Sequence, residues 1–298
     1  MQRITSRLSK YISFCVLFIV IGLLLISMPI QRAAAQGIES KGLTLSPLRT
    51  ELNIMPGTLS DGVLITTNST DKPIVVQLSA EEFSVVNQQY DYSFDSGSDI
   101  AKWVKFASNN INLAAGESKQ VSFSIAVPLN AEPGGRYLSL FASTDISDND
   151  INSRQRVASL LYITVDGNVI RDGNLISLTS PWAISGDNMW SMTLQNTGTT
   201  HFRSRYNAVI KNILFDGEVA NVSGDALVLP GTVRVVSDKM PMPQFPGLYK
   251  VIYTIGLGDK PAIVETRWLI YMPLWATIII VICIIFIILA LLRKTKKY

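Results

Sequence analysis

The chain carries a single histidine, His201, in the stretch "LQNTGTTHF" that runs from Leu194 to Phe202. A histidine can act as a catalytic base, but triad chemistry also needs a nucleophile and an orienting group in the same pocket. The sequence contains no GxSxG or comparable nucleophile motif, and no acid pair is placed for glycoside hydrolysis. We therefore interpret His201 as a structural residue, assign no catalytic residue and no cofactor, and expect the protein not to be an enzyme.

One acidic stretch resembles the start of a calcium-binding loop, with Asp148, Asp150 and Asn152 at alternate positions. The complete pattern continues with a glycine and a distant glutamate. Here Ser153 and Ser159 occupy those two places. We interpret residues 145–156 as an exposed acidic loop, with a weak ion site at these three residues as the alternative.

Two tryptophans, Trp182 and Trp190, are candidates for ligand binding. They flank "AISGDNM", which is typical of a hairpin loop. Aromatic rings stack on sugars and on partner side chains, and they are also ordinary core residues. Both readings remain open for this pair.

Alternation of apolar and polar residues dominates the middle of the chain. In "QVSFSIAV", the side chains of Val121, Phe123, Ile125 and Val127 fall on one face, as in a half-buried strand. Further short apolar runs are separated by clusters of Gly, Pro, Asn, Asp and Ser. This pattern is typical of a β-sandwich or barrel and predicts an all-β fold.

Two internal repeats divide this region. "MPGTLSDGVLITTN", "AAGESKQVSFSIAV" and "LPGTVRVVSDKM" each place a glycine-containing turn before an alternating run. "ITTNSTDKPIVVQL" and "TLQNTGTTHFRSRY" both consist of a strand, a turn centred on Asn68 or Asn196, and a second strand. Aligning the asparagines puts His201 opposite Pro73, at a strand start and on the outward-facing parity. We predict two related immunoglobulin-like β-sandwich domains, 36–166 and 167–271.

Apolar blocks lie at both ends of the chain. Basic residues, an apolar run and "AAA" predict a secretory signal peptide over 1–35, with an uncleaved anchor helix as the alternative. Residues 272–292 are predicted to form a transmembrane helix, followed by a basic cytoplasmic tail, 293–298. The location expected from these features is a cell membrane, crossed once, with both sandwiches outside. The residues assigned to the membrane interface are Trp268, Tyr271, Trp275, Arg293, Lys294, Lys296 and Lys297.

Charge and cysteine content exclude several classes of function. Seven cations flank the two apolar blocks, so the formal charge of +3 leaves the region between them slightly acidic and without a basic patch for nucleic acid. The only cysteines, Cys15 and Cys283, lie within the apolar blocks. The region between them therefore has no disulfide, thiol redox pair or thiolate metal site.

The stretches from "LSPLRTELNIMPGTLSDG" to "EPGGRYLSLF" resemble the first domain of bacterial WxL-interacting surface proteins. "LQNTGTTHF", "NILFDGEVA" and "LVLPGTVRVV" resemble their second domain. The resemblance implies an immunoglobulin-like domain that binds peptidoglycan, a second β-domain and a C-terminal anchor. The chain departs from the family's partners in having no WxL tripeptide near its C-terminus and no LPxTG sorting motif.

These observations predict a non-catalytic surface protein. It would bind or adhere to cell-wall polymer or to another surface protein, with no small-molecule substrate. The alternative is an envelope assembly or scaffold subunit that acts through lateral protein contacts. Sheet edges and loops would carry the contacts in either case.

Overall fold

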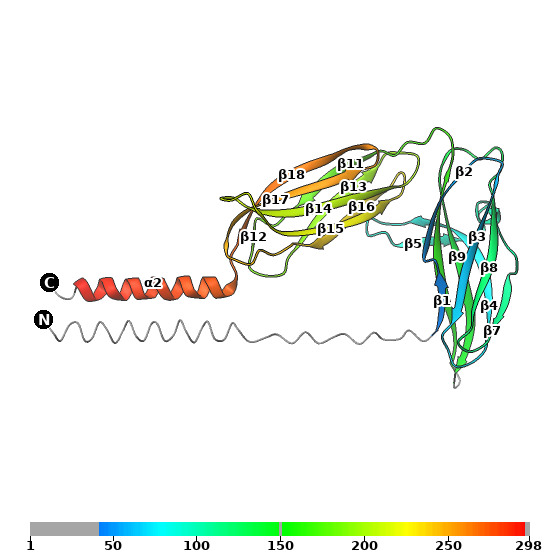
Figure 1. The fold of residues 1–298 in the computed structure, drawn as a ribbon, viewed down its shortest axis with the longest axis horizontal. Coiled ribbons are helices and arrows are strands. Elements are labelled where there is room, and N and C mark those ends of the chain that lie inside the picture. Colours follow the sequence, from blue (N-terminus) through cyan, green and yellow to red (C-terminus); the bar gives the residue numbers. More distant parts are fainter. Residues whose placement is uncertain (1–41, 149–150, 296–298) are drawn as a thin grey trace. The chain divides into compact units, whose positions relative to one another are not determined.

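The computed structural model describes residues 42–148 and 151–295, without the side chains of 146–153, 290 and 293–295. The predicted signal peptide, 1–35, lies outside the described residues. Within the described ranges the chain forms strands, one short 3₁₀ helix and one α-helix (Figure 1). The predicted all-β architecture is confirmed for the region before that α-helix.

The first ten strands build one sandwich of two sheets, with strand orders β1-β3-β8-β6 and β2-β10-β9-β4-β5, and with β7 also paired to β4. All pairs are antiparallel except β2 with β10. The elements are β1 (Leu43–Ser46), β2 (Arg49–Ile54), β3 (Leu59–Asn68), β4 (Ile74–Val85), β5 (Tyr92–Asp95), η1 (Ala101–Trp103), β6 (Val104–Phe106), β7 (Asn110–Leu113), β8 (Ser118–Ala126), β9 (Gly134–Asp148) and β10 (Ile151–Val165).

The next eight strands build a second sandwich, with sheet orders β11-β13-β16 and β12-β18-β17-β14-β15. Its one parallel pair, β12 with β18, corresponds to β2 with β10. The strands are β11 (Gly173–Thr179), β12 (Ala183–Ile184), β13 (Met189–Asn196), β14 (Phe202–Asn212), β15 (Glu218–Val228), β16 (Val233–Lys239), β17 (Gly247–Leu257) and β18 (Lys260–Tyr271).

Both sandwiches have an immunoglobulin-like topology. In each, the first strand is divided, so that its first half pairs in one sheet and its second half runs parallel to the last strand in the other sheet. The remaining strands distribute over the two sheets as in immunoglobulin domains. The exact limits of the domains, 36–166 and 167–271, stay predictions.

Alternation along the strands fills the two cores. Strand β8 buries Val121, Phe123 and Ile125 in the first core, as its sequence pattern predicts. Strand β13 buries Trp190, Met192 and Leu194 in the second. Neither core contains a disulfide, so burial of these apolar faces is the main source of stability.

The predicted glycine turns are confirmed. Gly57, Gly116 and Gly231 have φ angles of 76°, 72° and 69°, and each precedes a strand: β3, β8 and β16. A positive φ is costly for residues with a Cβ, which explains glycine at the second central position of these turns.

The acidic loop predicted at 145–156 is wrong. Strand β9 continues to Asp148, strand β10 starts at Ile151, and their backbones pair from Asp148 with Ile151 to Ser143 with Arg156. The polar composition does not prevent strand formation here, because each strand pairs with the adjacent strand of the hairpin and strands near a hairpin tip tolerate charged side chains. Asp148 and Asn152 lie in these strands, while their side chains and the whole of Asp150 lie outside the described residues.

The membrane prediction is contradicted. The predicted segment does form a helix, α2 (Leu274–Thr295), but a membrane crossing needs about 20 residues of sustained apolarity. In the part of the chain that the structure describes, no helix combines that length with that apolarity. The transmembrane helix predicted at 272–292 and the predicted single-pass location in a cell membrane are therefore wrong.

The residues assigned to the membrane interface lie in two elements. Trp268 and Tyr271 belong to β18, where Tyr271 packs into the second core, and Trp275 belongs to the first turn of α2. The side chains of Arg293, Lys294, Lys296 and Lys297 lie outside the described residues.

Candidate functional site at the junction of the two sandwiches

Equivalent asparagines hold the turn after the second strand of each sandwich. The amide Nδ2 of Asn196 donates to the carbonyl oxygens of Thr200 (2.9 Å) and Val228 (2.7 Å), and its Oδ1 accepts from the N–H of Gly198 (2.8 Å). Such side-chain bonds substitute for backbone partners that a turn leaves unpaired. The turn "NTGTTH" is therefore fixed from within its own sandwich.

Asn68 makes the same set of contacts in the first sandwich. Its Nδ2 donates to the carbonyls of Lys72 (2.8 Å) and Ala114 (2.9 Å), and its Oδ1 accepts from the N–H of Thr70 (3.0 Å). The predicted correspondence between Asn68 and Asn196 is confirmed by these bonds.

The turn after Asn196 also contacts the first sandwich. The carbonyl of Thr199 accepts from the N–H of Gly135 (2.9 Å), and the hydroxyls of Thr200 and Thr164 lie 3.1 Å apart. An added Cβ at Gly134 would lie 2.8 Å from the Thr199 oxygen. The glycines of "EPGGRY" at the start of β9 thus allow the two backbones to approach.

His201 lies at this contact. It faces away from its own core, as predicted, while its neighbour Phe202 points inward. The first sandwich covers it, so that His201 is only 8% exposed. Its backbone N–H donates to the Tyr137 hydroxyl (3.0 Å), and its ring packs against the rings of Tyr137 and Tyr162, with centroids 5.6 and 5.4 Å away.

Burial sets the electrostatics of this contact. It lowers the pKa of His201 to about 4, with the cations Arg171 and Arg203 acting in the same direction and Glu51 opposing them. Burial also raises the pKa of Tyr137 well above its ordinary value. Both groups are therefore neutral at neutral pH, as expected of a packed contact between domains.

The hairpin between β4 and β5 makes a second contact with the other sandwich. The Tyr90 hydroxyl accepts from the N–H of Leu229 (2.7 Å) and lies 2.6 Å from the hydroxyl of Thr232. The Arg234 guanidinium lies 4.3 Å from the centre of the Tyr90 ring. The carbonyl of Gln88 accepts from the N–H of Val235 (2.9 Å), so this hairpin also bonds to the open side of β16, the edge strand of its sheet.

An apolar cluster joins these two contacts. It contains side chains from both sandwiches, namely Phe83, Tyr90, Tyr137, Tyr162, Leu227 and Leu229. Aromatic rings in such clusters bury large areas and prefer edge-to-face geometry, as between Phe83 and Tyr162. The two sandwiches are thus joined through a small core of their own.

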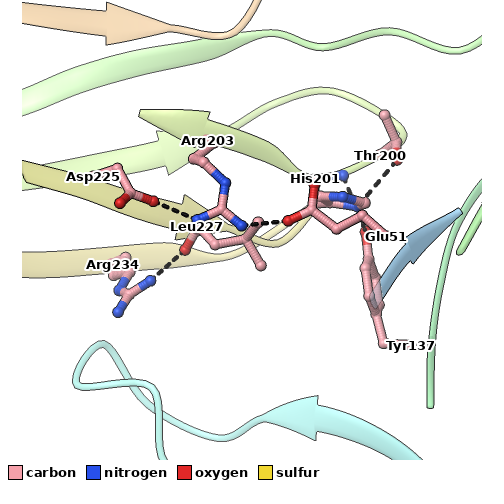
Figure 2. Close-up of polar contacts among 8 residues, drawn as sticks. All are labelled: Glu51, Tyr137, Thr200, His201, Arg203, Asp225, Leu227 and Arg234. Carbon is pink, nitrogen blue, oxygen red and sulfur yellow. Dashed lines mark hydrogen bonds and ion pairs between the residues drawn. The ribbon is translucent and has the colours of Figure 1, made fainter. Parts of the chain in front are cut away.

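Arg203 forms ion pairs with residues of both sandwiches. Its guanidinium bonds both to Glu51 on β2 and to Asp225 on β15, as Figure 2 shows. Nearby, Arg234 donates to the carbonyl of Leu227 (2.5 Å). Partly exposed ion pairs contribute little to stability, but bonds to two carboxylates fix the orientation of a guanidinium.

A cleft of about 330 Å³ opens beside this network. One wall is β2, and the others come from the start of β14, from Arg171 and from the turn between β17 and β18. The lining residues are Glu51, Leu52, Asn53, Thr164, Arg171, His201, Phe202, Arg203, Gly258 and Asp259.

Two features of the cleft are available for binding. Among the described residues, the guanidinium of Arg171 has no hydrogen bond or ion pair to a side chain. Strand β2 is the edge of its sheet. The carbonyls of Leu48 and Ile54 accept from the N–H groups of Leu160 in β10 and of Asp166 directly after it. Because backbone direction alternates along a strand, the N–H and C=O groups of Glu51 and Asn53 face outward.

The tryptophan candidates are placed very differently. Trp190 is 1% exposed and packs against Tyr206 and Tyr253 in the second core, which leaves no face of its ring for a ligand. Trp182 is 73% exposed and precedes β12. Neither lines the cleft, and ligand binding at Trp182 stays a prediction.

Sequence reasoning missed Tyr90, Tyr137, Arg171 and Arg203, which build the junction. The one available indication was the pair of arginines on the outward-facing parity after His201, in "FRSRY". The partners of Tyr90, Tyr137 and Arg203 in the other sandwich lie 64 to 152 residues away along the chain, beyond the reach of local patterns.

Comparisons with known proteins assign neither a family nor a function to the chain. No family model and no curated protein matches the chain. Solved structures that align include the class 5 fimbriae chaperone CfaA (10% identity, 76% of this chain and 99% of that chain, TM-score 0.42). The SafB chaperone with SafA pilin of Salmonella enterica (13%, 78% and 97%, 0.39) and the periplasmic chaperone SfaE (13%, 77% and 100%, 0.37) also align.

These TM-scores are below 0.5, and the likeness assigns no function to the chain. The immunoglobulin-like sandwich follows from the strand order itself. The finer resemblance to WxL-interacting surface proteins is not shown by the comparisons and stays a prediction.

Proposed function

We propose that the protein is a non-catalytic binding protein that takes an extended segment of a partner protein into the junction cleft. The observation that supports this most directly is that one cleft combines an open sheet edge, β2, with the unpaired guanidinium of Arg171. An extended peptide adds to a sheet edge through backbone hydrogen bonds, and side-chain contacts then give specificity.

The charges of the cleft favour a partner segment of particular composition. The guanidinium of Arg203 is already paired with Glu51 and Asp225, whereas Arg171 and Asp259 are left to face a ligand. A segment that fits would place a carboxylate against Arg171 and a donor against Asp259. Guanidinium groups favour carboxylates because they offer paired N–H donors in one plane.

The junction gives this cleft fixed walls. Three separate contacts hold the two sandwiches together: the bonds of the Tyr90 hydroxyl, which we call the Tyr90 clamp, the backbone bond at Thr199 and the ion pairs of Arg203. A preorganised site loses less conformational entropy on binding than a mobile one. The buried aromatic residues of the junction therefore favour binding, because they keep the walls of the cleft in place.

Site-specific photocrosslinking of the full-length protein in the cells that make it tests the proposal. A photoreactive residue at Asn53, in the cleft, is expected to capture a protein, whereas one at Asn207, exposed on β14 outside the cleft, is not. Arg171→Glu is expected to abolish capture, and Arg205→Glu, at an exposed arginine outside the cleft, to preserve it.

Two results would overturn the proposal. Equal capture from Asn53 and Asn207 would show that the cleft is not the binding site. Retention of the protein on protein-free peptidoglycan that depends on Arg171 would instead identify cell-wall polymer as the ligand, because its peptides also carry carboxylates.

A further inference from the structure

Strand β18 has one side paired along β17 and the other side largely open. β12 covers the open side only at Ile270 and Tyr271. Between residues 264 and 269, no strand of the described chain pairs with that side. In Figure 1, β18 borders the second sandwich as a long orange strand.

The register identifies which backbone groups face outward. The N–H of Ile270 donates to the carbonyl of Trp182 (2.8 Å) on the open side. Pairing with β17 is regular from Ile263 to Tyr271. Because backbone direction alternates along a strand, the N–H and C=O groups of Val264, Thr266 and Trp268 also point to the open side.

The side chains around Thr266 form a symmetric pattern. On the outer face, Val264 and Trp268 are each 62% exposed. On the other face, which carries the buried Leu269, Glu265 and Arg267 form an ion pair of 3.0 Å with side chains 36% and 47% exposed. The sequence "VETRW" thus has an apolar residue at each end and opposite charges on either side of Thr266.

We infer that this edge pairs with the same edge of a second copy of the chain, antiparallel and centred on Thr266. That register places Val264 opposite Trp268 of the second copy and Glu265 opposite Arg267. Both kinds of cross-strand pair are favourable. Three outward-facing residues per strand form three directly opposed pairs, with about two hydrogen bonds each.

The charges argue for a second copy rather than for an unrelated strand. Charged residues on the core-facing side of an edge strand normally prevent pairing, because an added strand would bury them. Here the two charges are opposite, and an antiparallel copy presents their complements in reversed order. A two-fold symmetric contact of this kind is closed and cannot extend into a fibre.

The ends of the open stretch restrict the register. At one end β12 occupies the edge at Ile270, with the exposed Trp182 beside it. At the other end Pro261 has no N–H to donate, and Lys260 is bound to Asp172 across the sandwich. Only the segment around Thr266 remains for pairing.

Charge reversal in the full-length protein tests this inference, with molecular mass measured by sedimentation velocity over a range of concentrations. The native chain is expected to dimerise. Glu265→Arg alone and Arg267→Glu alone each oppose like charges across the two-fold axis and are expected to weaken dimerisation at least tenfold. The double variant Glu265→Arg/Arg267→Glu restores both pairs and is expected to dimerise again.

An equimolar mixture of the two single variants supplies the sharpest measurement. In a mixed dimer, the arginine introduced into one chain lies opposite the glutamate introduced into the other, and the native Arg267 of the first lies opposite the native Glu265 of the second. The mixture is therefore expected to associate although neither variant does alone. All these chains retain α2, so association through that helix would be unaffected by the charges. Unchanged dimerisation of the single variants, a monomeric native chain or failure of the mixture would each overturn the inference.

This inference is independent of the proposed cleft function. The β18 edge and the β2 edge belong to different sandwiches. Arg171→Glu is expected to leave dimerisation unchanged, and Glu265→Arg to leave capture at the cleft unchanged, so failure of either idea is distinguishable from failure of the other.

Discussion

Replacing Tyr90 by phenylalanine removes one hydroxyl from the clamp between the sandwiches. In the native chain this hydroxyl accepts the N–H of Leu229 at 2.7 Å and lies 2.6 Å from the Thr232 hydroxyl. Thr232 keeps another partner, the carbonyl of Leu229 at 2.8 Å. The variant therefore leaves one buried donor, the Leu229 N–H, without a partner.

The expected cost follows from that single donor. Leu229 is buried, and an unsatisfied buried donor costs about 1–3 kcal/mol. The ring of Tyr90 and its contact with Arg234 remain in the variant. We expect the free energy that holds the sandwiches together to fall by about 2 kcal/mol, which is roughly a 30-fold change in the equilibrium for their separation.

Hydrogen exchange of the Leu229 amide measures this change directly, because that amide is exposed when the sandwiches separate. Tyr249→Phe is the matched control, since its hydroxyl bonds only to the carbonyl of Phe245 within the second sandwich. Unchanged protection of Leu229 in Tyr90→Phe, or equal loss in both variants, would refute the assignment of Tyr90 as a clamp.

Two further substitutions test how the turns at the junction are held. Asn196→Ala removes two donors and leaves the Gly198 N–H unpaired, so we expect a loss of about 2 kcal/mol, measured by urea unfolding, and a similar loss for the equivalent Asn68→Ala. Gly258→Ala would bring a Cβ to 2.4 Å from the Arg171 carbonyl at a φ of +71°, so we expect about 1–3 kcal/mol of destabilisation by thermal unfolding, whereas Gly217→Ala, where a Cβ meets nothing within 4 Å, should have little effect.

Local patterns were sufficient to predict most of the fold. The alternation in "QVSFSIAV" predicted the buried face of β8. The repeated asparagine turn predicted two related sandwiches, because the side chains of Asn68 and Asn196 bond to equivalent backbone groups of their turns. The tip of the β9–β10 hairpin was missed because its polar composition is typical of a loop, whereas backbone pairing between the two adjacent strands decides its structure.

The junction could not be predicted in the same way. The alternation of side chains along the strand correctly predicted that His201 faces away from its own core. That Tyr137 and Tyr162 cover it depends on the position of the other sandwich. Trp190 and Trp182 are equivalent in the sequence argument and differ only because β13 directs Trp190 into the core. Contacts across long separations depend on the completed fold, which one sequence does not display.

The burial of His201 makes the stability of the protein depend on pH. Its pKa is about 4 in the folded protein and close to 6.5 in an unfolded chain. Above pH 6.5 the imidazole is neutral in both states. As the pH falls from 6.5 towards 4, the unfolded state binds a proton that the folded state does not, so stability falls by up to about 1.4 kcal/mol per pH unit and about 3 kcal/mol in total.

Urea unfolding of the native chain and of His201→Gln, followed from pH 7.5 to 4.5, measures this contribution. Carboxylates titrate in both proteins at the acidic end, so the difference between the two curves isolates His201. We expect the native chain to lose stability more steeply than the variant between pH 6.5 and 4.5. Parallel curves would mean that the imidazole is protonated within the fold, and that the contact with Tyr137 and Tyr162 does not exclude water from it.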